Sequence, residues 1–382
     1  MLPIKQFSNY FHENNSINAY NQIQITSKCN AKCIFCSNEQ NPFEIERLDF
    51  RDPKEIEKVV WATPFINGYI HLNESLPGRI SEGEALIHPQ LFEILKIIRK
   101  KFNNTIVITT NGSLLTEEMI QKLACFKPIE IVISFHSTDR ENWKNIFNLG
   151  DQQYEIAVNS FNLLNRYKIP INASMVTMPN WLGYNDIEKT LKFFKDNKCN
   201  DVIIFSSGYT NYTNKEVVNK LIYDKRELSN FLKMIKEKYH LYIKWPGDPD
   251  LPLYINVLYL TDIIKNISIS GLEEVYILTS VAAYDRFKIL IADINISSPM
   301  KLIPVKVENK TYGGNIDCLA LWMIDDIRQK IKELNLNNTT IIFSDEFTDK
   351  YGFDLMGENL LDFKRECIEK FNINLQIIQT KI

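Results

Sequence analysis

Three cysteines near the N-terminus are the residues whose type and spacing most clearly support chemistry. Cys29, Cys33 and Cys36 follow a C-x₃-C-x₂-C spacing, directly after the alternating apolar residues Ile23 and Ile25. Three thiolates this close together can ligate three irons of a [4Fe–4S] cube. The fourth iron then stays open, and an open iron can bind a small molecule instead of only passing electrons.

Two other metal or redox sites would use some of the same residues. A structural zinc site usually needs four protein ligands in two separated pairs, and the sequence has no second C-x₂-C pair. A redox dithiol needs only Cys33 and Cys36 and leaves Cys29 without a role. The spacing therefore favours the iron–sulfur cluster.

Composition bounds the class of protein. The chain has 382 residues, 45% of them hydrophobic, and a formal charge of −3, which indicates packed cores and argues against a large nucleic-acid interface. The N-terminus lacks the apolar segment of a secretory signal, and no window is apolar enough to cross a membrane. We expect a soluble, cytoplasmic protein. The remaining cysteines are isolated in the sequence, which argues against a second cluster: Cys125, Cys199, Cys318 and Cys367.

The elements that must position the cysteines alternate between strand and helix from residue 20 onwards. Six strands are predicted, each followed by a helical pattern, at 20–26, 68–73, 105–109, 129–135, 171–176 and 202–206. Such alternation indicates a parallel α/β sheet, either open and doubly wound or closed towards a barrel. The cysteines follow the carboxyl end of the first strand, where these sheets place their active sites.

The chain is predicted to fold as two domains. Residues 1–19 form a polar N-terminal arm, 20–245 the first domain, and 246–256 a proline-rich linker. Residues 257–382 form a smaller α/β domain, with strands predicted at 275–279, 302–307, 340–343 and 375–378.

The cysteine spacing, with the aromatic Phe35 before the last cysteine, resembles the signature of the radical S-adenosylmethionine (SAM) enzymes. The resemblance implies a partial (βα)₆ TIM-like barrel, with the methionine part of SAM chelated to the open iron. It implies reductive cleavage of SAM to a 5′-deoxyadenosyl radical that abstracts hydrogen from a substrate. It also implies an adenine contact by the backbone near Phe35, and an external electron donor such as ferredoxin or flavodoxin.

Two further stretches resemble SAM-binding segments of this family. Gly83 and Glu84 lie where the family has Gly-Gly-Glu, although Glu82 and Ala85 replace its usual glycine and proline. The resemblance implies that Gly83 and Glu84 bind the amino group of SAM, since glycine permits close approach of the backbone and a carboxylate pairs with an ammonium. Asn111 lies in a Thr-Asn-Gly segment after the third strand, a position beside SAM in the family; otherwise Asn-Gly is a simple turn.

The ends of later strands supply weaker candidates. Ser134 aligns with a family serine that approaches SAM, and His136 stands where the family often has aspartate. His136 would face the substrate, or would be a hydrogen-bonded structural residue. Met175 would pack on adenine or in the core, and Ser206 would complete the wall of the adenine or substrate site.

The C-terminal domain loosely resembles an uncharacterised domain found behind some radical SAM domains. Gly313 and Gly314 would form either an anion-binding nest before a helix or a tight turn. Cys318 is a candidate hydrogen donor to a substrate radical. More often, such an isolated cysteine is a small buried apolar residue.

The sequence leaves the substrate open. Without a second cluster, we favour hydrogen abstraction from a peptide or protein presented by the C-terminal domain. The alternatives are a cobalamin-assisted radical SAM methyltransferase, for which no D-x-H-x-x-G segment is present, an RNA-modifying enzyme, and a non-catalytic iron–sulfur or zinc sensor.

Overall fold

The structure of the chain is a computed structural model. It describes residues 22–36, 40, 45, 47–63, 66, 68–73, 83–245, 247–248, 274–295, 301–317, 319–349 and 351–378. These residues divide into two compact units. The first holds the described residues between 22 and 248 except Ile45, and the second holds Ile45 with the described residues from 274 onwards. The predicted arm at 1–19 and nearly all of the predicted linker lie outside the described residues.

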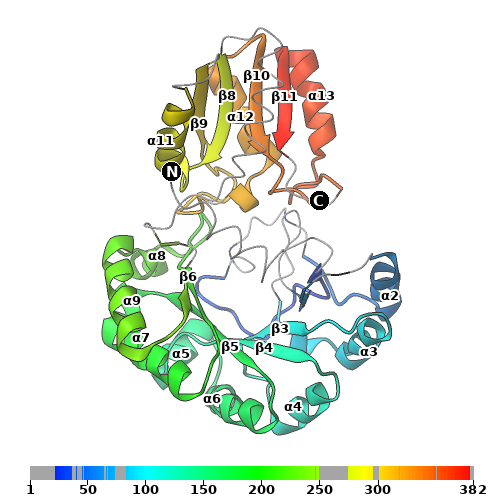
Figure 1. Cartoon of the computed structure of the whole chain (residues 1–382), viewed down its shortest axis with the longest axis vertical. Helices are drawn as coiled ribbons and strands as arrows, with labels where there is room; N and C mark the ends of the chain where they lie inside the picture. Colours follow the sequence, from blue (N-terminus) through cyan, green and yellow to red (C-terminus); the bar gives the residue numbers. More distant parts are fainter. Residues whose placement is uncertain are drawn as a thin grey trace. The chain divides into compact units, whose positions relative to one another are not determined.

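The first unit is built on one seven-stranded sheet in which every neighbouring pair is parallel (Figure 1). Its spatial order is the sequence order: β1 (Gln22–Ile23), β2 (Ile70–Leu72), β3 (Ile106–Thr110), β4 (Ile129–Ser134), β5 (Ile171–Thr177), β6 (Val202–Ser206) and β7 (Ile243–Lys244). A doubly wound sheet reverses its strand order at a switch point. This order does not reverse, so the first unit is a barrel-type sheet, as predicted.

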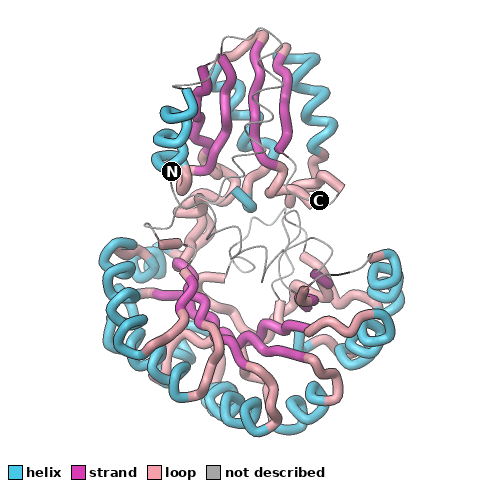
Figure 2. The backbone as a smooth tube through the Cα atoms, in the orientation of Figure 1, coloured by secondary structure: helices cyan, strands magenta, loops and turns pink. Residues whose placement is uncertain are grey.

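The barrel is partial within the described part of the chain, since β7 is not paired with β1 there. All six predicted strands are present, and β7 is an additional short strand that the sequence did not indicate. Figure 2 shows the strands lining the inner side of a curved layer of helices. That layer consists of α2 (Pro53–Ala62), α3 (Leu91–Lys101), α4 (Glu117–Ala124), α5 (Arg140–Phe147), α6 (Asp151–Arg166), α7 (Pro179–Asp196), α8 (Lys215–Leu221) and α9 (Lys225–Tyr239).

Strand alternation separates the core from the barrel interior. Ile129, Ile131 and Ile133 of β4 are at most 2% exposed and belong to the hydrophobic core that packs the sheet against its helices. The residues that alternate with these isoleucines, Val132 and Ser134 among others, therefore point to the other face of the sheet, towards the barrel interior. The same alternation in β3, β5 and β6 decides which predicted site residues face that interior.

Helix α5 was not predicted, although its start carries a clear signal. Asp139 caps it by accepting a hydrogen bond from the Asn142 N–H at 2.9 Å, as Asp at an N-cap does. Trp143 is fully buried and anchors the helix in the core. Asp52 before α2 and Thr116 before α4 are caps of the same kind, and each accepts a backbone N–H bond through its side chain.

The second unit contains a four-stranded parallel sheet of order β11-β10-β8-β9. Its strands are β8 (Glu274–Ser280), β9 (Lys301–Val307), β10 (Thr339–Ser344) and β11 (Ile373–Ile378), and its helices are α11 (Tyr284–Asn295), α12 (Ile324–Leu334) and α13 (Leu360–Phe371). The order reverses between β8 and β10, so this unit is doubly wound. A separate hydrophobic core packs α12 and α13 against the sheet.

Candidate active site

The three cysteines lie on the loop that follows β1, which we call the cysteine loop (residues 27–36). In a parallel barrel the loops after the strands meet at one end, the carboxyl end of the sheet. The loops that follow β2, β3 and β4 carry most of the other predicted site residues. The fold therefore brings stretches up to about a hundred residues apart in sequence to the same edge.

The three thiols lie close enough to influence one another. The Cys29 residue is exposed as a whole, but burial of its thiol group raises the pKa of that thiol to about 11. Burial raises the pKa of Cys33 well above its ordinary value, and the neighbouring charges of Cys36 and Cys29 add to this effect. A metal that binds the thiolates supplies the positive charge that such a group of sulfurs lacks.

The donor set fits a [4Fe–4S] cluster better than a single metal ion. A structural zinc usually takes four protein ligands, whereas the cysteine loop supplies three thiols. In a cluster each cysteine binds a different iron, so Cys29, Cys33 and Cys36 need only surround the cluster, and three thiols leave one iron open.

Helix α5 holds the cysteine loop through backbone hydrogen bonds. Its last carbonyl oxygens accept backbone hydrogen bonds from the loop: Lys32 N–H donates to Phe147 O at 3.0 Å and Ile34 N–H to Ile146 O at 3.1 Å. Carbonyls in the last turn of a helix have no partner inside the helix. The loop uses two of them, so the element that the sequence analysis missed fixes the middle of the cysteine loop.

Gly83 touches the cysteine loop through its backbone. A Cβ added at Gly83 would lie 2.2 Å from the Lys28 carbonyl oxygen, so only glycine fits this position. The Glu84 N–H donates to the same Lys28 oxygen at 2.9 Å. The predicted Gly-Glu segment and the cysteine loop are thus joined directly beside Cys29.

Asn73, which the sequence analysis did not single out, holds the same junction. Its Oδ1 accepts the N–H groups of Ile25 at 3.0 Å and Thr26 at 2.9 Å, and its Nδ2 donates to Gly83 O at 2.8 Å. Asn73 itself adopts a left-handed φ of 64°, a conformation that asparagine tolerates better than most residues. Its position directly after β2 was the one feature of the sequence that could have marked it as a site residue.

The carboxylate of Glu84 is buried and bonded to backbone. Oε1 accepts the Leu86 N–H at 3.2 Å and Oε2 accepts the Asn111 N–H at 2.9 Å. Burial raises its pKa, while these hydrogen bonds and one from Thr110 oppose that shift. Two carboxylate oxygens have room for about four hydrogen bonds, so Glu84 retains acceptor capacity for a ligand.

Asn111 reaches the cysteine loop through its side chain. Its Nδ2 donates to Asn30 Oδ1 at 2.9 Å, and Asn30 Nδ2 donates to Ser113 Oγ at 2.9 Å. Ser113 Oγ in turn donates to Asn111 Oδ1 at 2.5 Å, which closes a ring of side chains. Asn30 was not predicted, because its partners lie more than 80 residues away in the sequence.

Ser134 and Met175 lie on opposite faces of the sheet. Ser134 Oγ is 3.3 Å from Ser174 Oγ on the neighbouring strand β5, where the two hydroxyls share a hydrogen bond. Met175 has no exposed surface and belongs to the hydrophobic core with Ala173. Of the two interpretations of Met175, the structure places it in core packing, and the residue of β5 beside Ser134 is Ser174.

His136 packs beneath Phe35. Its ring is stacked on Phe147 with centroids 4.8 Å apart and meets Phe35 edge-on at 4.9 Å. The Val176 N–H donates to His136 Nδ1 at 3.1 Å, so the ring proton of the neutral histidine is on Nε2. Burial lowers the His136 pKa to about 3, which keeps the ring neutral. These contacts match the structural interpretation of His136.

The remaining predicted residues lie at the edges of the site or outside the described chain. Ser206 Oγ accepts a hydrogen bond from Trp245 Nε1 at 3.2 Å, at the end of β6. Beyond the cysteines, Gln40 bonds through its side chain to Ile34 and Thr213 and so ties the cysteine loop to the loop after β6. Cys318 lies outside the described residues.

The glycines of the second unit form a turn. The Gly313 N–H donates to Asn309 O at 3.0 Å, and both glycines have positive φ. At the start of α12, carboxylates of the protein itself accept the backbone amides: Asp354 from Ile324 at 2.8 Å and Asp326 from Met323 at 3.3 Å. The amides at the start of α12 are therefore bonded to carboxylates of the chain, and the Gly313 N–H is bonded within the turn.

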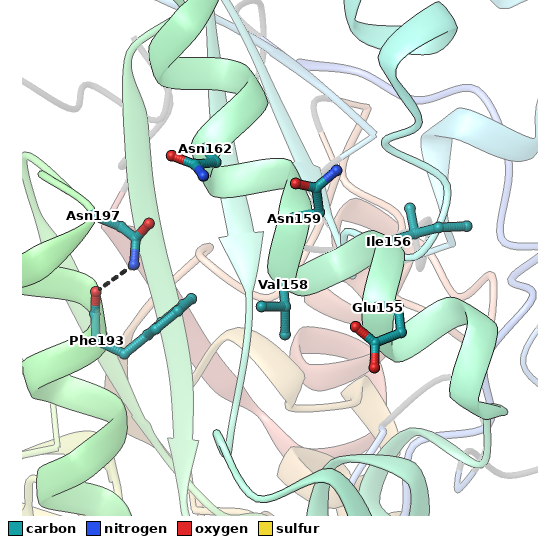
Figure 3. A pocket seen from close by; sticks show the side chains of 7 residues that line it. All are labelled: Glu155, Ile156, Val158, Asn159, Asn162, Phe193 and Asn197. Atoms are coloured by element: carbon teal, nitrogen blue, oxygen red, sulfur yellow. Dashed lines mark hydrogen bonds between the residues drawn. The ribbon is translucent and has the colours of Figure 1, made fainter.

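A surface cavity of about 630 Å³ lies between α6 and α7 in the helix layer (Figure 3). It is lined by Glu155, Ile156, Val158, Asn159, Asn162, Phe193 and Asn197, none of which is a predicted site residue. The helix layer covers the side of the sheet away from the barrel interior, so this cavity is separate from the cysteine loop.

Comparison with known proteins agrees with the site. Residues 23–194 match the model of the radical SAM superfamily. This segment of the chain belongs to the radical SAM superfamily. Members of this superfamily are enzymes that use a [4Fe–4S] cluster and SAM, and the matched segment of the radical SAM domain contains the cysteine loop, Gly83, Glu84, Asn111 and Ser134.

Relatives match this radical SAM protein over part of its length. The antilisterial bacteriocin subtilosin biosynthesis protein AlbA of Bacillus subtilis is 32% identical over 119 residues, 31% of this chain and 24% of AlbA. A probable GTP 3′,8-cyclase of Methanocaldococcus jannaschii is 27% identical over 180 residues, 46% of this chain and 54% of the cyclase. The chain thus spans between about a quarter and about half of these relatives.

Among solved structures, Streptococcus suis SuiB bound to S-adenosylmethionine is similar, with a TM-score of 0.47 and 17% identity over 59% of this radical SAM protein and 50% of SuiB. The described part of the chain contains no helix long and apolar enough to cross a membrane.

Proposed function

We propose that this protein is a radical SAM enzyme that abstracts hydrogen from a peptide or protein substrate. Cys29, Cys33 and Cys36 would hold the [4Fe–4S] cluster. When bound, the cluster supplies the electron that cleaves SAM into methionine and a 5′-deoxyadenosyl radical. The observation that carries the proposal is the direct bonding of both predicted SAM segments to the cysteine loop, through Glu84 N–H and the Asn111 side chain.

The residues around the cysteine loop would bind and orient SAM. Glu84, with acceptor capacity left on its buried carboxylate, would accept the ammonium of the methionine part, with Gly83 allowing the backbone to approach. Asn111 and Ser134 would donate hydrogen bonds to the carboxylate or ribose of SAM. The backbone near Phe35 would contact adenine, and Ser206 would close the wall of the site.

The barrel interior favours an uncharged or peptide group over a nucleoside triphosphate. Strand pairing puts Val132, Ser134, Ser174, Val176 and Phe205 on the interior face in the carboxyl halves of β4, β5 and β6. None of these five side chains is positively charged, and Lys244, which the pairing of β6 with β7 puts on the same face, is bonded to Asp201 at 2.5 Å. A triphosphate such as that of GTP would need basic partners, so we favour the class of substrate suggested by the name of AlbA over that of the GTP 3′,8-cyclases.

We further propose that a one-electron donor such as ferredoxin or flavodoxin reduces the enzyme, and that it works in the cytoplasm. An oxygen-labile cluster on free thiols suits a reducing compartment. The second α/β unit would present the substrate to the barrel. Cys318 is retained as a candidate hydrogen donor, whereas the buried His136, which stacks on Phe147, is not proposed as a substrate contact.

The test is anaerobic reconstitution, reduction with dithionite, addition of SAM, and detection of 5′-deoxyadenosine by mass spectrometry. We expect product from the wild type and from Cys125→Ala, which removes an exposed cysteine away from the loop, and none from Cys33→Ala. Transfer of deuterium from a labelled peptide to 5′-deoxyadenosine would identify the substrate class. A fully loaded protein that forms no product with dithionite or flavodoxin would contradict the proposal.

A further inference from the structure

A connected set of hydrogen bonds lies next to Cys29. Asn30, Asn111 and Ser113 bond to one another through their side chains, at distances of 2.5 to 2.9 Å. The Asn111 N–H bonds to the Glu84 carboxylate, and the Glu84 N–H bonds back to the Lys28 oxygen. We call these four residues, Asn30, Glu84, Asn111 and Ser113, the Cys29 frame.

Three of the four members of the frame are buried, whereas Asn30, on the cysteine loop, is partly exposed. Glu84 is 3% exposed, Asn111 is 7% exposed and Ser113 has no exposed surface. A buried polar network in which each member is bonded holds a single geometry, because breaking one bond leaves an unpaired polar group. The frame is therefore a rigid support and not a mobile surface loop.

The frame holds the residues around one backbone N–H group that bonds to the Cys29 sulfur. The Ala31 N–H lies 3.4 Å from Cys29 Sγ. The Glu84 N–H, which bonds to the Lys28 oxygen, and the Asn30 N–H also oppose the rise in the pKa of Cys29. All three donors belong to frame residues or to the residue next to Asn30. Their direction thus depends on the bonds that Asn30 and Glu84 make to the loop after β3.

Hydrogen bonds to a ligand sulfur set the reduction potential of an iron–sulfur cluster. Each N–H group aimed at sulfur stabilises the reduced, more negative cluster and so raises its potential. We infer that Asn30, held by Asn111 and Ser113, is a positioning residue that raises the reduction potential of the cluster by fixing these N–H donors around Cys29. This inference rests on the proposed function, because it requires the cluster on Cys29.

The experiment is a potentiometric titration of the reconstituted, SAM-free protein, followed by EPR. We expect Asn30→Ala to shift the midpoint potential to a more negative value at unchanged iron content. The matched control is Asn165→Ala in α6, which also loses two side-chain hydrogen bonds, to Phe161 O and Asn197 O, but none near the cysteine loop. The control should keep the wild-type potential.

A double-mutant cycle tests whether the residues act as one frame. If Asn30 acts through Asn111, the double variant Asn30→Ala/Asn111→Ala should show no larger shift than the larger of the two single shifts. Additive shifts, or a wild-type potential in Asn30→Ala, would overturn the inference. Should Asn30→Ala fail to load iron, Ser113→Ala removes one side of the ring without altering the cysteine loop and is expected to shift the potential in the same direction.

The outcome is separable from that of the proposed function. If the midpoint potential of Asn30→Ala is shifted to a more negative value and the wild type cleaves SAM with dithionite as the reductant, both the inference and the proposed function are supported. SAM cleavage in the wild type with an unshifted potential in the variants overturns the frame alone. No SAM cleavage by a loaded wild type, with a shifted potential in the variants, overturns the proposed function alone.

Discussion

At the scale of single residues, the site depends on a few close contacts with the cysteine loop. Gly83 is the clearest case, because its missing side chain is what allows the Lys28 carbonyl to approach. Glu84, Asn30 and Asn111 then connect three segments through buried and partly buried hydrogen bonds. Substitutions at these positions should therefore affect iron binding as well as stability.

Gly83→Ala is expected to lower the free energy of unfolding by about 1–3 kcal/mol, because the added methyl forces the backbone of the cysteine loop to move. Iron bound per chain after reconstitution should fall with it. Urea unfolding and iron analysis provide the measurement. Gly150→Ala is the control, since its added Cβ meets only the flexible end of Gln153; equal losses in both variants would contradict the role of Gly83.

His136 gives a prediction on pH. The unfolded histidine takes up a proton near pH 6.5, whereas the folded one does so only near pH 3. Between these values the unfolded state binds more protons, so the folded state loses stability as the pH falls. From pH 7 to pH 5 the loss is about 2 kcal/mol, since one pH unit corresponds to about 1.4 kcal/mol.

His136→Phe removes this dependence while it keeps an aromatic ring against Phe35 and Phe147. Urea unfolding of both proteins at pH 7 and pH 5 checks the expectation. The wild type should lose about 2 kcal/mol more than the variant over this interval. Equal losses would contradict this expectation and show that His136 takes up its proton at the same pH in the folded and the unfolded protein.

At the scale of elements, α5 binds the cysteine loop through hydrogen bonds to its last two carbonyl oxygens. Trp143→Ala should lower the free energy of unfolding by about 3–5 kcal/mol, as for other buried aromatic residues, and should reduce iron retention. Phe194→Ala in α7, also fully buried, is the matched control. If both variants retain iron equally at equal loss of stability, α5 has no particular role in the loop.

The sequence predicted the elements better than their side-chain bonds. Hydrophobic alternation predicts the six barrel strands and the four strands of the second unit. The capping residues Asp52 and Thr116 likewise mark the starts of α2 and α4. Asn30 and Gln40 bond to residues 81 and 173 positions away, and no local pattern encodes such pairs. Helix α5 was missed although Asp139 signals its start, because its apolar pattern is short.

Met175 illustrates the same limit. The sequence places it on the fifth strand, but a shift of one residue decides which face of a strand a side chain occupies. The pairing of Ser134 with Ser174 fixes that register and turns Met175 towards the core. Register depends on the neighbouring strand, so it became known only with the sheet.

At the scale of the whole molecule, each unit has a hydrophobic core of its own. Asp354→Ala removes the carboxylate that accepts the N–H groups of Ile324, Met356 and Glu358. We expect a loss of about 1–3 kcal/mol confined to the second unit. Calorimetry should show one unfolding transition with a lowered midpoint temperature, and iron analysis should show an unchanged iron content. A parallel loss of iron would mean that the units do not fold independently.

The central claim is that Cys29, Cys33 and Cys36 hold a cluster with one iron open to SAM. EPR of the reduced, reconstituted protein, recorded with and without SAM, tests it most directly. The account predicts about four irons per chain and a spectrum that changes on addition of SAM, in the wild type and in Cys125→Ala alike. A fully loaded cluster whose spectrum stays the same at saturating SAM, with a protein group on the fourth iron, would contradict it and indicate a non-catalytic iron–sulfur sensor.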